Sequence, residues 1–392
     1  ASPAAVAVGD ARPRRSWLPT GVTQYLLWGV GLVLIVGPIV PVVWASLWST
    51  PLYEAGGGVT LANYRDLLSD PGWWDAVRNS LTFATLTTVG SVVLGTAMAV
   101  LFARTDLPGR RVFAAAVLLP VAVPGLPLIL GWAAIYSPSG YVTRWLEENT
   151  PIPVFWDLYS VPGMAMLATG IAAPVVALLV RGAISGQDAA LEQAARTAGA
   201  TPVRALTSVT VPLLRPALLN SGLIVFALSL EVLGLPLILG TSRNIEFISS
   251  FLYDRWLNTV PSQQGLVSAG AVLLLAVVTV LLVLRNRLAG DTARFHTVGG
   301  KTTAIDLIRL GAARWPLCAA VTAYLVIVLV LPMVGLLLTA FTTTLTPFID
   351  PWTVLSTQHF RTVVDDPVFS RSITNSLLVA VIGGALATLA IA

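Results

Sequence analysis

Charged residues are scarce in this chain of 392 residues: they make up 11% of it, whereas 56% is hydrophobic and the mean hydropathy is +0.81. A soluble domain carries about 25% charged residues, so this composition excludes an ordinary water-soluble protein. Cysteine and histidine are almost absent too. With only Cys318 and two histidines, the sequence allows no internal disulfide and shows no cluster that predicts a metal site.

The chain instead contains eight long apolar runs. A helix needs about 20 residues to cross roughly 30 Å of hydrocarbon, whereas transmembrane β-strands are shorter and alternate in polarity. The predicted spans are residues 24–48, 79–103, 112–136, 161–181, 217–241, 265–285, 316–340 and 376–392, the last of which reaches the end of the sequence. The sequence therefore predicts an all-α polytopic protein embedded in a lipid bilayer.

Basic residues are concentrated on one side of the predicted spans. With the N-terminus inside, the cytosolic segments contain 16 of the 23 basic residues and six acids, whereas the outside loops contain seven basic residues and twelve acids. This positive-inside distribution predicts a multi-pass protein of the plasma membrane (the inner membrane of a bacterium) with a cytosolic N-terminus. It also accounts for the pI near 9.5, so we expect no nucleic-acid partner.

The sequence repeats itself at an offset of 296 residues, because residues 64–96 align without gaps with residues 360–392. Seven positions are identical, including Asp70-Pro71 and the Asn-Ser-Leu segment at 79–81. Six predicted helices separate the starts of the two copies, so both copies have the same orientation. The sequence therefore predicts a parallel internal duplication about an axis normal to the membrane.

The duplication predicts a division of the chain into units. Residues 1–20 are expected to form a cytosolic N-terminal tail, and residues 21–287 a first six-helix unit that contains a polar loop at 182–216. A basic cytosolic linker is expected at 288–315, and residues 316–392 are expected to begin a second, truncated unit. By the same offset, a second copy of the polar loop is expected near position 488.

The polar loop lies between the fourth and fifth predicted spans. Its alanines, from Ala189 to Ala198, recur at helical spacing and form a smooth face that another protein could approach closely. Glu192 complements the positive end of the helix dipole, and Gly199 supplies the left-handed conformation that ends a helix. A second short helix then leads to Pro212, which opens the next span. The pattern suits either a docking site for a partner protein or an amphipathic helix that rests on lipid.

The order Glu-x-Ala-Ala, then Gly, then apolar-x-apolar-Pro resembles the "EAA" loop of type I ABC-importer permeases. Gln193 replaces the usual first alanine, and Val211 stands where leucine is common. The resemblance implies the type I transmembrane fold, a cytosolic dimer of ABC ATPase subunits that receives the loop, and a soluble or lipid-anchored substrate-binding protein outside. The residues to which it assigns coupling to the ATPase are Glu192, Ala195, Gly199, Ala200 and Pro212.

Two units in one chain resemble the ferric-iron permease group, and residues 295–301 resemble the linker of that group. The resemblance implies ferric iron as the solute, while aminoethylphosphonate, thiamine and polyamine remain alternatives. Gly300-Lys301-Thr302 mimics the end of a P-loop, but Phe295 stands where its first glycine is required. We therefore expect ATP hydrolysis in a separate subunit and neither catalytic residues nor a cofactor in this chain.

Glu231 is the only carboxylate well inside a predicted span. Because an ionisable residue is costly in a bilayer, it is a candidate to line the pathway or to move protons, although a structural carboxylate bonded to a neighbouring helix fits the pattern too. A proton-coupled secondary transporter that uses Glu231 is accordingly the rival function.

The third predicted span is rich in proline. Pro120, Pro124 and Pro127 predict a kinked or broken helix whose freed carbonyls face a cavity. The string Gly-Leu-Pro-Leu-Ile-Leu-Gly occurs at 125–131 and again at 234–240, where it contains Pro236. These prolines are candidates for a gate along the pathway, and a plain kink filled by packing is the alternative.

Overall fold

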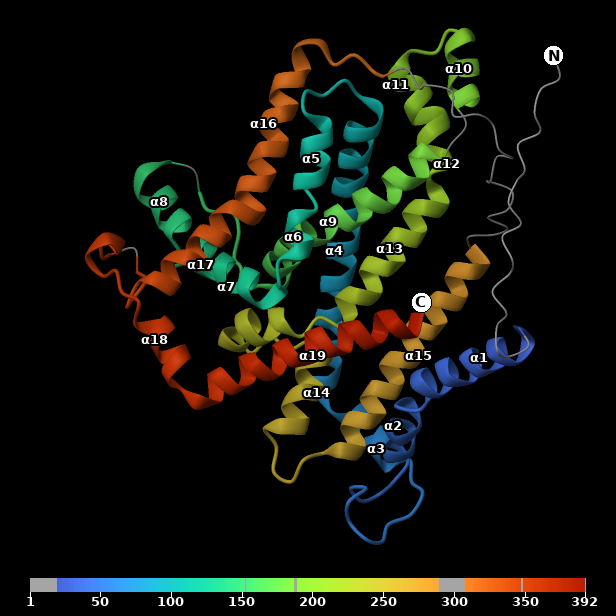
Figure 1. Ribbon diagram of the computed structural model, residues 1–392, viewed down its shortest axis with the longest axis vertical. Coiled ribbons are helices and arrows are strands. Elements are labelled where there is room, and N and C mark those ends of the chain that lie inside the picture. The colour runs from blue at the N-terminus through green and yellow to red at the C-terminus, as the bar shows by residue number, and fades with distance from the viewer. Residues whose placement is uncertain (1–19, 152, 187–188, 289–306, 347, 392) are drawn as a thin grey trace, which may run out of the picture. The chain divides into compact units, whose positions relative to one another are not determined.

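The computed structural model describes residues 20–151, 153–186, 189–288, 307–346 and 348–391 (Figure 1). The predicted N-terminal tail up to residue 19 and the linker residues 289–306, with Gly300-Lys301-Thr302, lie outside the described residues. Within these ranges the chain is almost entirely helical, and its only β-type pairings are isolated bridges. The predicted all-α fold is confirmed.

Six of the described helices are long and apolar enough to cross a membrane, and the number rises to eight if each of two bent helix pairs counts as one span. The bent pairs are Arg110–Ala122 with Gly125–Asn149, at 99°, and Leu206–Leu213 with Arg215–Leu230, at 55°. They correspond to the third and fifth predicted spans. The number of spans therefore agrees with the sequence, whereas two of them are not straight helices.

The described chain divides into two compact units. The first contains the residues through Ser69 together with Arg255–Leu275. Its helices are α1 (Thr20–Val36), α2 (Ile39–Ser46), α3 (Ala62–Ser69) and the first part of α15 (Gln264–Leu288). The predicted first span is interrupted between α1 and α2 at Pro38, because proline cannot donate the hydrogen bond that would continue the helix.

The second unit contains Asp70–Asp254 and the residues from Ala276 onward. In chain order its helices are α4 (Pro71–Arg104), α5 (Arg110–Ala116), α6 (Leu119–Ala122), α7 (Gly125–Tyr136), α8 (Tyr141–Asn149), α9 (Val161–Ser185), α10 (Ala189–Thr197), α11 (Pro202–Ala205), α12 (Val211–Leu213), α13 (Arg215–Leu230), most of α14 (Ile248–Leu257), the end of α15, α16 (Arg314–Leu325), α17 (Leu331–Phe341), α18 (Gln358–Asp365) and α19 (Pro367–Ile391). Three π-helical turns lie among them, at Leu206–Thr210, Pro236–Gly240 and Val326–Val330.

Helices α4 and α9 pack closely at the centre of the second unit. A side chain on Gly95 of α4 would place its Cβ 2.5 Å from the carbonyl oxygen of Ala173 in α9, and one on Gly90 would meet Thr169 at 2.8 Å. Small residues of this kind let two helix backbones approach each other where burial of apolar side chains gives little driving force in lipid. Both helices end at the same side of the unit, at Arg104 and Ser185.

The third predicted span is broken, as its prolines predict. Pro120 lies in the first turn of α6, and the extended backbone of Val123 and Pro124 separates α6 from α7. Pro127 then lies in the first turn of α7, where its missing N–H leaves no hydrogen bond unmade.

Pro332 follows the π-helical turn Val326–Val330 and frees two backbone carbonyls there. Leu331 donates to Val326 in the wide turn and Pro332 cannot donate at all, so neither residue donates to the carbonyls of Ile327 and Val328. Tyr136 Oη donates to Ile327 at 3.0 Å and Trp132 Nε1 donates to Val328 at 3.2 Å. Two aromatic side chains of α7 therefore satisfy the break and join α17 to α7.

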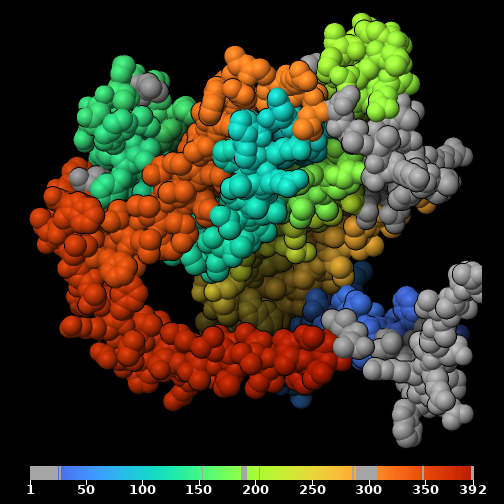
Figure 2. Space-filling view, turned by 45° about the horizontal axis from the view of Figure 1, so that its top comes forward, coloured from blue at the N-terminus to red at the C-terminus, as the bar shows by residue number. Residues whose placement is uncertain are grey.

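Two pairs of helices begin at the same spacing as the predicted sequence repeat. Helices α18 and α19 begin 296 residues after α3 and α4. Asp70 and Asp366 have the same capping role, because their carboxylates accept hydrogen bonds from the backbone N–H of Gly72 at 2.8 Å and Val368 at 2.7 Å. Figure 2 shows α18 and α19 in red, extending from α17 as an arm, and no residue in the apolar stretch Pro367–Leu389 is buried.

Candidate functional site

The polar loop after α9 begins with α10, which ends in a Schellman motif. The N–H of Ala200 donates to Ala195 at 3.0 Å, the N–H of Gly199 donates to Arg196 at 3.0 Å, and Gly199 has a φ of +91°. Glycine occupies this left-handed position at no steric cost, which is why the helix ends here. Three of the predicted coupling residues, Ala195, Gly199 and Ala200, are thus parts of one turn.

The second half of the loop is a helix with a widened turn. It begins at α11, where the Thr201 hydroxyl accepts from Arg204 N–H at 3.3 Å, and continues through the π-helical turn Leu206–Thr210 into α12. Pro212 in α12 has no N–H and its ring would clash with the carbonyl four residues earlier in a regular helix, so the wide turn accommodates it. Pro212 therefore fixes the point at which the loop turns into α13.

Glu192 holds the loop against the end of α4. Its carboxylate Oε2 lies 3.1 Å from Nη1 of Arg104 and accepts a hydrogen bond from the hydroxyl of Thr210 at 3.1 Å. The side chains of Arg104 and Glu192 are only 2% and 7% exposed. The arrangement joins the two halves of the loop, through Glu192 and Thr210, to the last residue of α4.

The buried ion pair has unmet hydrogen-bonding capacity. Among the described residues, Nε and Nη1 of Arg104 have no acceptor in hydrogen-bond geometry, so the contact with Glu192 is electrostatic and not an aligned hydrogen bond. A buried guanidinium without its carboxylate would lose the charge that compensates its desolvation. Glu192 therefore fixes the position of α10 through the charge of Arg104, and removing either side chain would leave the other buried without a countercharge.

The backbone of the same arginine is hydrogen-bonded to the last part of the predicted linker. The carbonyl of Arg104 accepts from Ile308 N–H at 2.8 Å, and Asp106 N–H donates back to Ile308 at 3.2 Å. The Asp106 carboxylate then accepts from Leu310 N–H at 2.8 Å. The end of α4 is thus a junction between the polar loop and the segment that leads into α16.

The remaining described surface of the loop is exposed and carries uncharged side chains, mostly small, together with Arg204. Gln193, Ala194 and Thr197 of the first helix are exposed, as are Ala198 just after it and Arg204, Thr207 and Ser208 of the second half. In Figure 1, α10 and α11 lie beyond the ends of α12 and α13. The contacts of Glu192 with Arg104 and Thr210 set the orientation of this face.

Glu231 does not lie in the middle of a helix, which corrects the continuous fifth span predicted at 217–241. Helix α13 ends at Leu230, Glu231 is its C-cap, and the backbone is irregular through Leu233. The Glu231 side chain is exposed, and the freed carbonyl of Val232 accepts a hydrogen bond from the Ser249 hydroxyl. The Gly and Pro residues that follow explain the break, because neither favours the interior of a helix.

The two Gly-Leu-Pro-Leu-Ile-Leu-Gly strings meet each other. A Cβ on Gly234, the first residue of the second string, would lie 2.8 Å from the Leu126 side chain and 3.4 Å from that of Ile129 in the first string. The structure thus brings together the segments that carry Pro127 and Pro236, both of which are at least half-buried. Pro120 is buried in the separate helix α6, and Pro124 is exposed.

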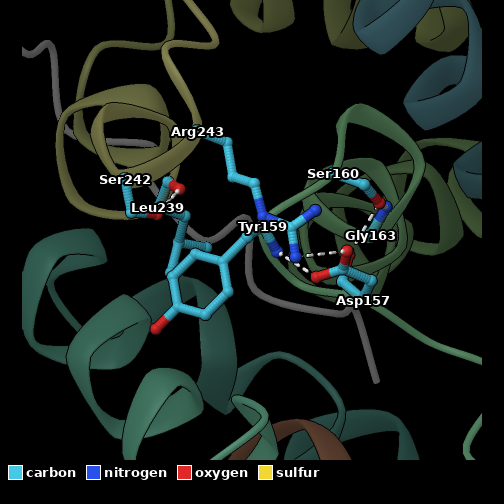
Figure 3. A network of polar contacts seen from close by, with 7 residues as sticks. All are labelled: Asp157, Tyr159, Ser160, Gly163, Leu239, Ser242 and Arg243. Atoms are coloured by element: carbon cyan, nitrogen blue, oxygen red, sulfur yellow. Dashed lines mark hydrogen bonds and ion pairs between the residues drawn. The ribbon is translucent and has the colours of Figure 1, made fainter.

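Next to the second string, Arg243 forms an ion pair with Asp157 at 3.3 Å (Figure 3). The other carboxylate oxygen of Asp157 accepts from Tyr159 N–H at 3.0 Å, and Ser160 caps α9 by accepting from Gly163 N–H at 3.2 Å. This network fastens the turn after residues 236–240 to the entry of α9. Sequence reasoning missed it because two exposed charges so far apart in sequence show no local pattern.

Arg104 and Thr210 were also missed. The available signals were a basic residue at the very end of a long apolar run and a threonine inside the Val-Thr-Val-Pro segment. Within the part of the chain that the structure describes, no group of three or more His, Cys, Asp or Glu side chains could hold a metal ion.

Comparison with known proteins places these features in a family. Residues 91–294 match the family described as binding-protein-dependent transport system inner membrane component. The chain is 31% identical over 179 residues to a putative ferric transport system permease protein of Haemophilus influenzae, covering 45% of this chain and 28% of that protein. It is 28% identical over 285 residues to the trehalose transport system permease protein SugB of Mycobacterium tuberculosis, covering 70% of this chain and 98% of that protein.

Among solved structures, the fold is similar to a chain of a bacterial alginate ABC transporter crystallised with an alginate-bound periplasmic protein. The TM-score is 0.55 at 19% identity, and the match covers 71% of this chain and 96% of that one. At this identity the likeness concerns the fold alone.

Proposed function

Because the chain belongs to the binding-protein-dependent transport system inner membrane component family, we propose that it forms the membrane-spanning pathway of an ATP-driven ABC importer. It would lie in the plasma membrane with its N-terminus and the loop at 182–216 in the cytosol. An ABC ATPase dimer would bind the loop, and a soluble or lipid-anchored binding protein would deliver the solute from outside. ATP hydrolysis would belong to the ATPase, and this chain would be no enzyme.

The observation that carries the proposal is the attachment of the loop to α4. Glu192 lies between Arg104 and Thr210, at 3.1 Å from each, while Gln193, Ala194 and Thr197 of α10 are exposed. A partner that moves α10 would therefore move the end of α4 through the ion pair and α13 through Pro212. Rigid helices joined at such a contact transmit a displacement across a membrane.

The duplication supports the proposed organisation of the chain. We assign residues 21–287 to a first permease unit, residues 288–315 to a cytosolic linker and residues 316–392 to the start of a second unit. Two observations support this assignment. Helix α18 begins 296 residues after α3, which is the offset of the sequence repeat, and Asp70 and Asp366 accept equivalent capping hydrogen bonds. The contact of Ile308 with Arg104 would place the end of the linker beside the coupling loop.

Ferric iron is the solute that we favour, because a ferric transport system permease is among the relatives with 31% identity. Relatives named for putrescine, 2-aminoethylphosphonate and trehalose transport keep other solutes as alternatives. A proton-coupled transporter that uses Glu231 is the second candidate function, since that carboxylate is exposed at a helix break. It predicts uptake without an ATPase, and loss of proton coupling in Glu231→Gln.

The test is co-purification of the protein with the ATPase encoded beside it, followed by measurement of ATPase stimulation. Gly199→Asp places a side chain at a φ of +91° and a charge on the docking face, so we expect loss of the complex. Gly311→Asp is the matched control, because Gly311 also has a positive φ of 57° and open space around it but lies outside the loop. An intact, fully stimulated complex with Gly199→Asp would show that the loop does not couple to the ATPase.

A further inference from the structure

Three arginines lie around one small cavity beside the polar loop, at the ends of three helices of the second unit. The cavity has a volume of about 180 Å³. It is lined by Phe102 and Ala103 of α4, Arg110 and Arg111 of α5, and Arg181, Ile184 and Ser185 of α9. Among the lining residues that the structure describes, the charged ones are all arginines, so the charge that they contribute is positive.

The three arginines differ in their contacts with the rest of the protein. Arg110 Nη1 donates to the carbonyl of Thr105 at 3.1 Å, which holds this side chain in place. Arg111 is exposed and Arg181 is half-buried, and neither forms an ion pair with a carboxylate among the described residues. Like charges gathered around one small volume repel one another, and a bound anion would convert this repulsion into attraction.

The cavity combines these charges with an apolar floor. Phe102 and Ile184 are 5% and 1% exposed, and they lie where the apolar segments of α4 and α9 end. Helix α4 ends at Arg104, α9 ends at Ser185 and α5 begins at Arg110, so three helix ends meet at one level. In a protein that spans a bilayer, this is the level of the lipid headgroups, where basic pockets between helices bind anionic headgroups.

The size of the cavity limits the kind of anion. Pockets for organic ligands usually measure about 300–1,000 Å³, and this cavity is smaller. A single phosphate group fits it better than a nucleotide or an organic solute. An apolar floor next to the cationic rim suits a phosphate that carries a glycerol and acyl chains, and a free inorganic phosphate would leave that floor without a contact.

We propose that this cavity binds the phosphate group of an anionic phospholipid. Arg111 and Arg181 bind the phosphate, Arg110 adds charge from its fixed position, and the glycerol backbone lies against Phe102 and Ile184. The site is separate from the coupling contact of Glu192, and it does not depend on which solute the protein transports or on how transport is driven.

Native mass spectrometry of the detergent-purified full chain tests the proposal. The protein is titrated with dioleoyl phosphatidylglycerol, with dioleoyl phosphatidylcholine as the zwitterionic lipid of equal chain length, and with inorganic phosphate as a competitor. The test variant is Arg111→Ala/Arg181→Ala. The control variant is Arg215→Ala/Arg309→Ala, which removes two other exposed arginines from the same predicted side of the membrane.

We expect the unmodified chain and the control variant to retain phosphatidylglycerol in preference to phosphatidylcholine. Loss of two charge-assisted contacts should weaken this retention by roughly tenfold or more in the test variant. Equal retention by all three proteins would overturn the site. Displacement of phosphatidylglycerol by inorganic phosphate would overturn the lipid as the source of the phosphate. If the double variant does not fold, Arg111→Ala alone changes an exposed side chain, and unchanged retention there would equally refute the proposal.

Discussion

Arg104, the last residue of α4, forms a buried ion pair with Glu192 of α10 at 3.1 Å. The two residues belong to different elements of the second unit, and the contact joins a membrane-spanning helix to a polar loop. The backbone carbonyl of Arg104 also accepts a hydrogen bond from Ile308. One residue therefore connects three segments that are distant in sequence.

Removing either partner of this pair should destabilise the protein strongly. Glu192→Gln or Arg104→Ala leaves the other side chain buried without its countercharge, which costs about 3–5 kcal/mol. Thermal unfolding of the purified chain measures this loss. Arg78→Ala is the control, because Arg78 and Asp75 form an ion pair 74% and 67% exposed, and such pairs contribute about 0–1 kcal/mol. Equal effects of the two changes would contradict a structural role for the buried pair.

Gly199 should be intolerant of a side chain for conformational reasons alone. Its φ is +91° and nothing lies within 4 Å of the place that a Cβ would occupy, so Gly199→Ala should cost about 1–2 kcal/mol through backbone strain and not through a clash. Gly182→Ala in α9 also meets open space, at a helical φ, and should stabilise by up to about 1 kcal/mol. Thermal unfolding, together with limited proteolysis of the loop, distinguishes the two, and a stabilised Gly199→Ala would exclude the left-handed turn.

The glycines at the two ends of one repeated string should differ in their tolerance of the same substitution. A Cβ on Gly131 would lie 2.2 Å from the carbonyl oxygen of Pro332, whereas one on Gly125 meets nothing within 4 Å. Gly131→Ala must therefore separate α7 from α17 and should cost about 1–3 kcal/mol or more, while Gly125→Ala should be nearly neutral. The melting temperatures of the two variants measure the difference. Equal melting temperatures would show that α17 does not pack on Gly131.

The Arg243–Asp157 ion pair should contribute little to stability and should depend on salt. Its side chains are 55% and 38% exposed, so Arg243→Ala should cost about 0–1 kcal/mol, and less as ionic strength rises. A double-mutant cycle with Asp157→Asn at low and high salt isolates the pair. A coupling energy that salt leaves unchanged would mean that the pair is more shielded from solvent than its exposure indicates.

The sequence predicted the helical class and, with both bent pairs counted, the number of spans, because these depend on local properties. Apolar run length predicts a membrane helix, and Asp-Pro followed by Asn-Ser-Leu at a fixed offset predicts a repeat whose helices begin at equivalent residues. The end of α10 at Gly199 and the break in the third span were equally local, because glycine and proline determine their own backbone conformation. The uneven charges predict an orientation that remains to be tested.

Only the tertiary structure decided which buried charges form an ion pair. In sequence, Arg104 is a basic residue at the end of an apolar run, Glu192 is one residue of a helical loop, and nothing pairs them. Likewise, Glu231 looked buried within a span, but α13 ends one residue before it and leaves it exposed. Hydropathy and periodicity describe one segment at a time. An ion pair, an exposed helix break or a cavity lined by three arginines depends on which segments the fold brings together.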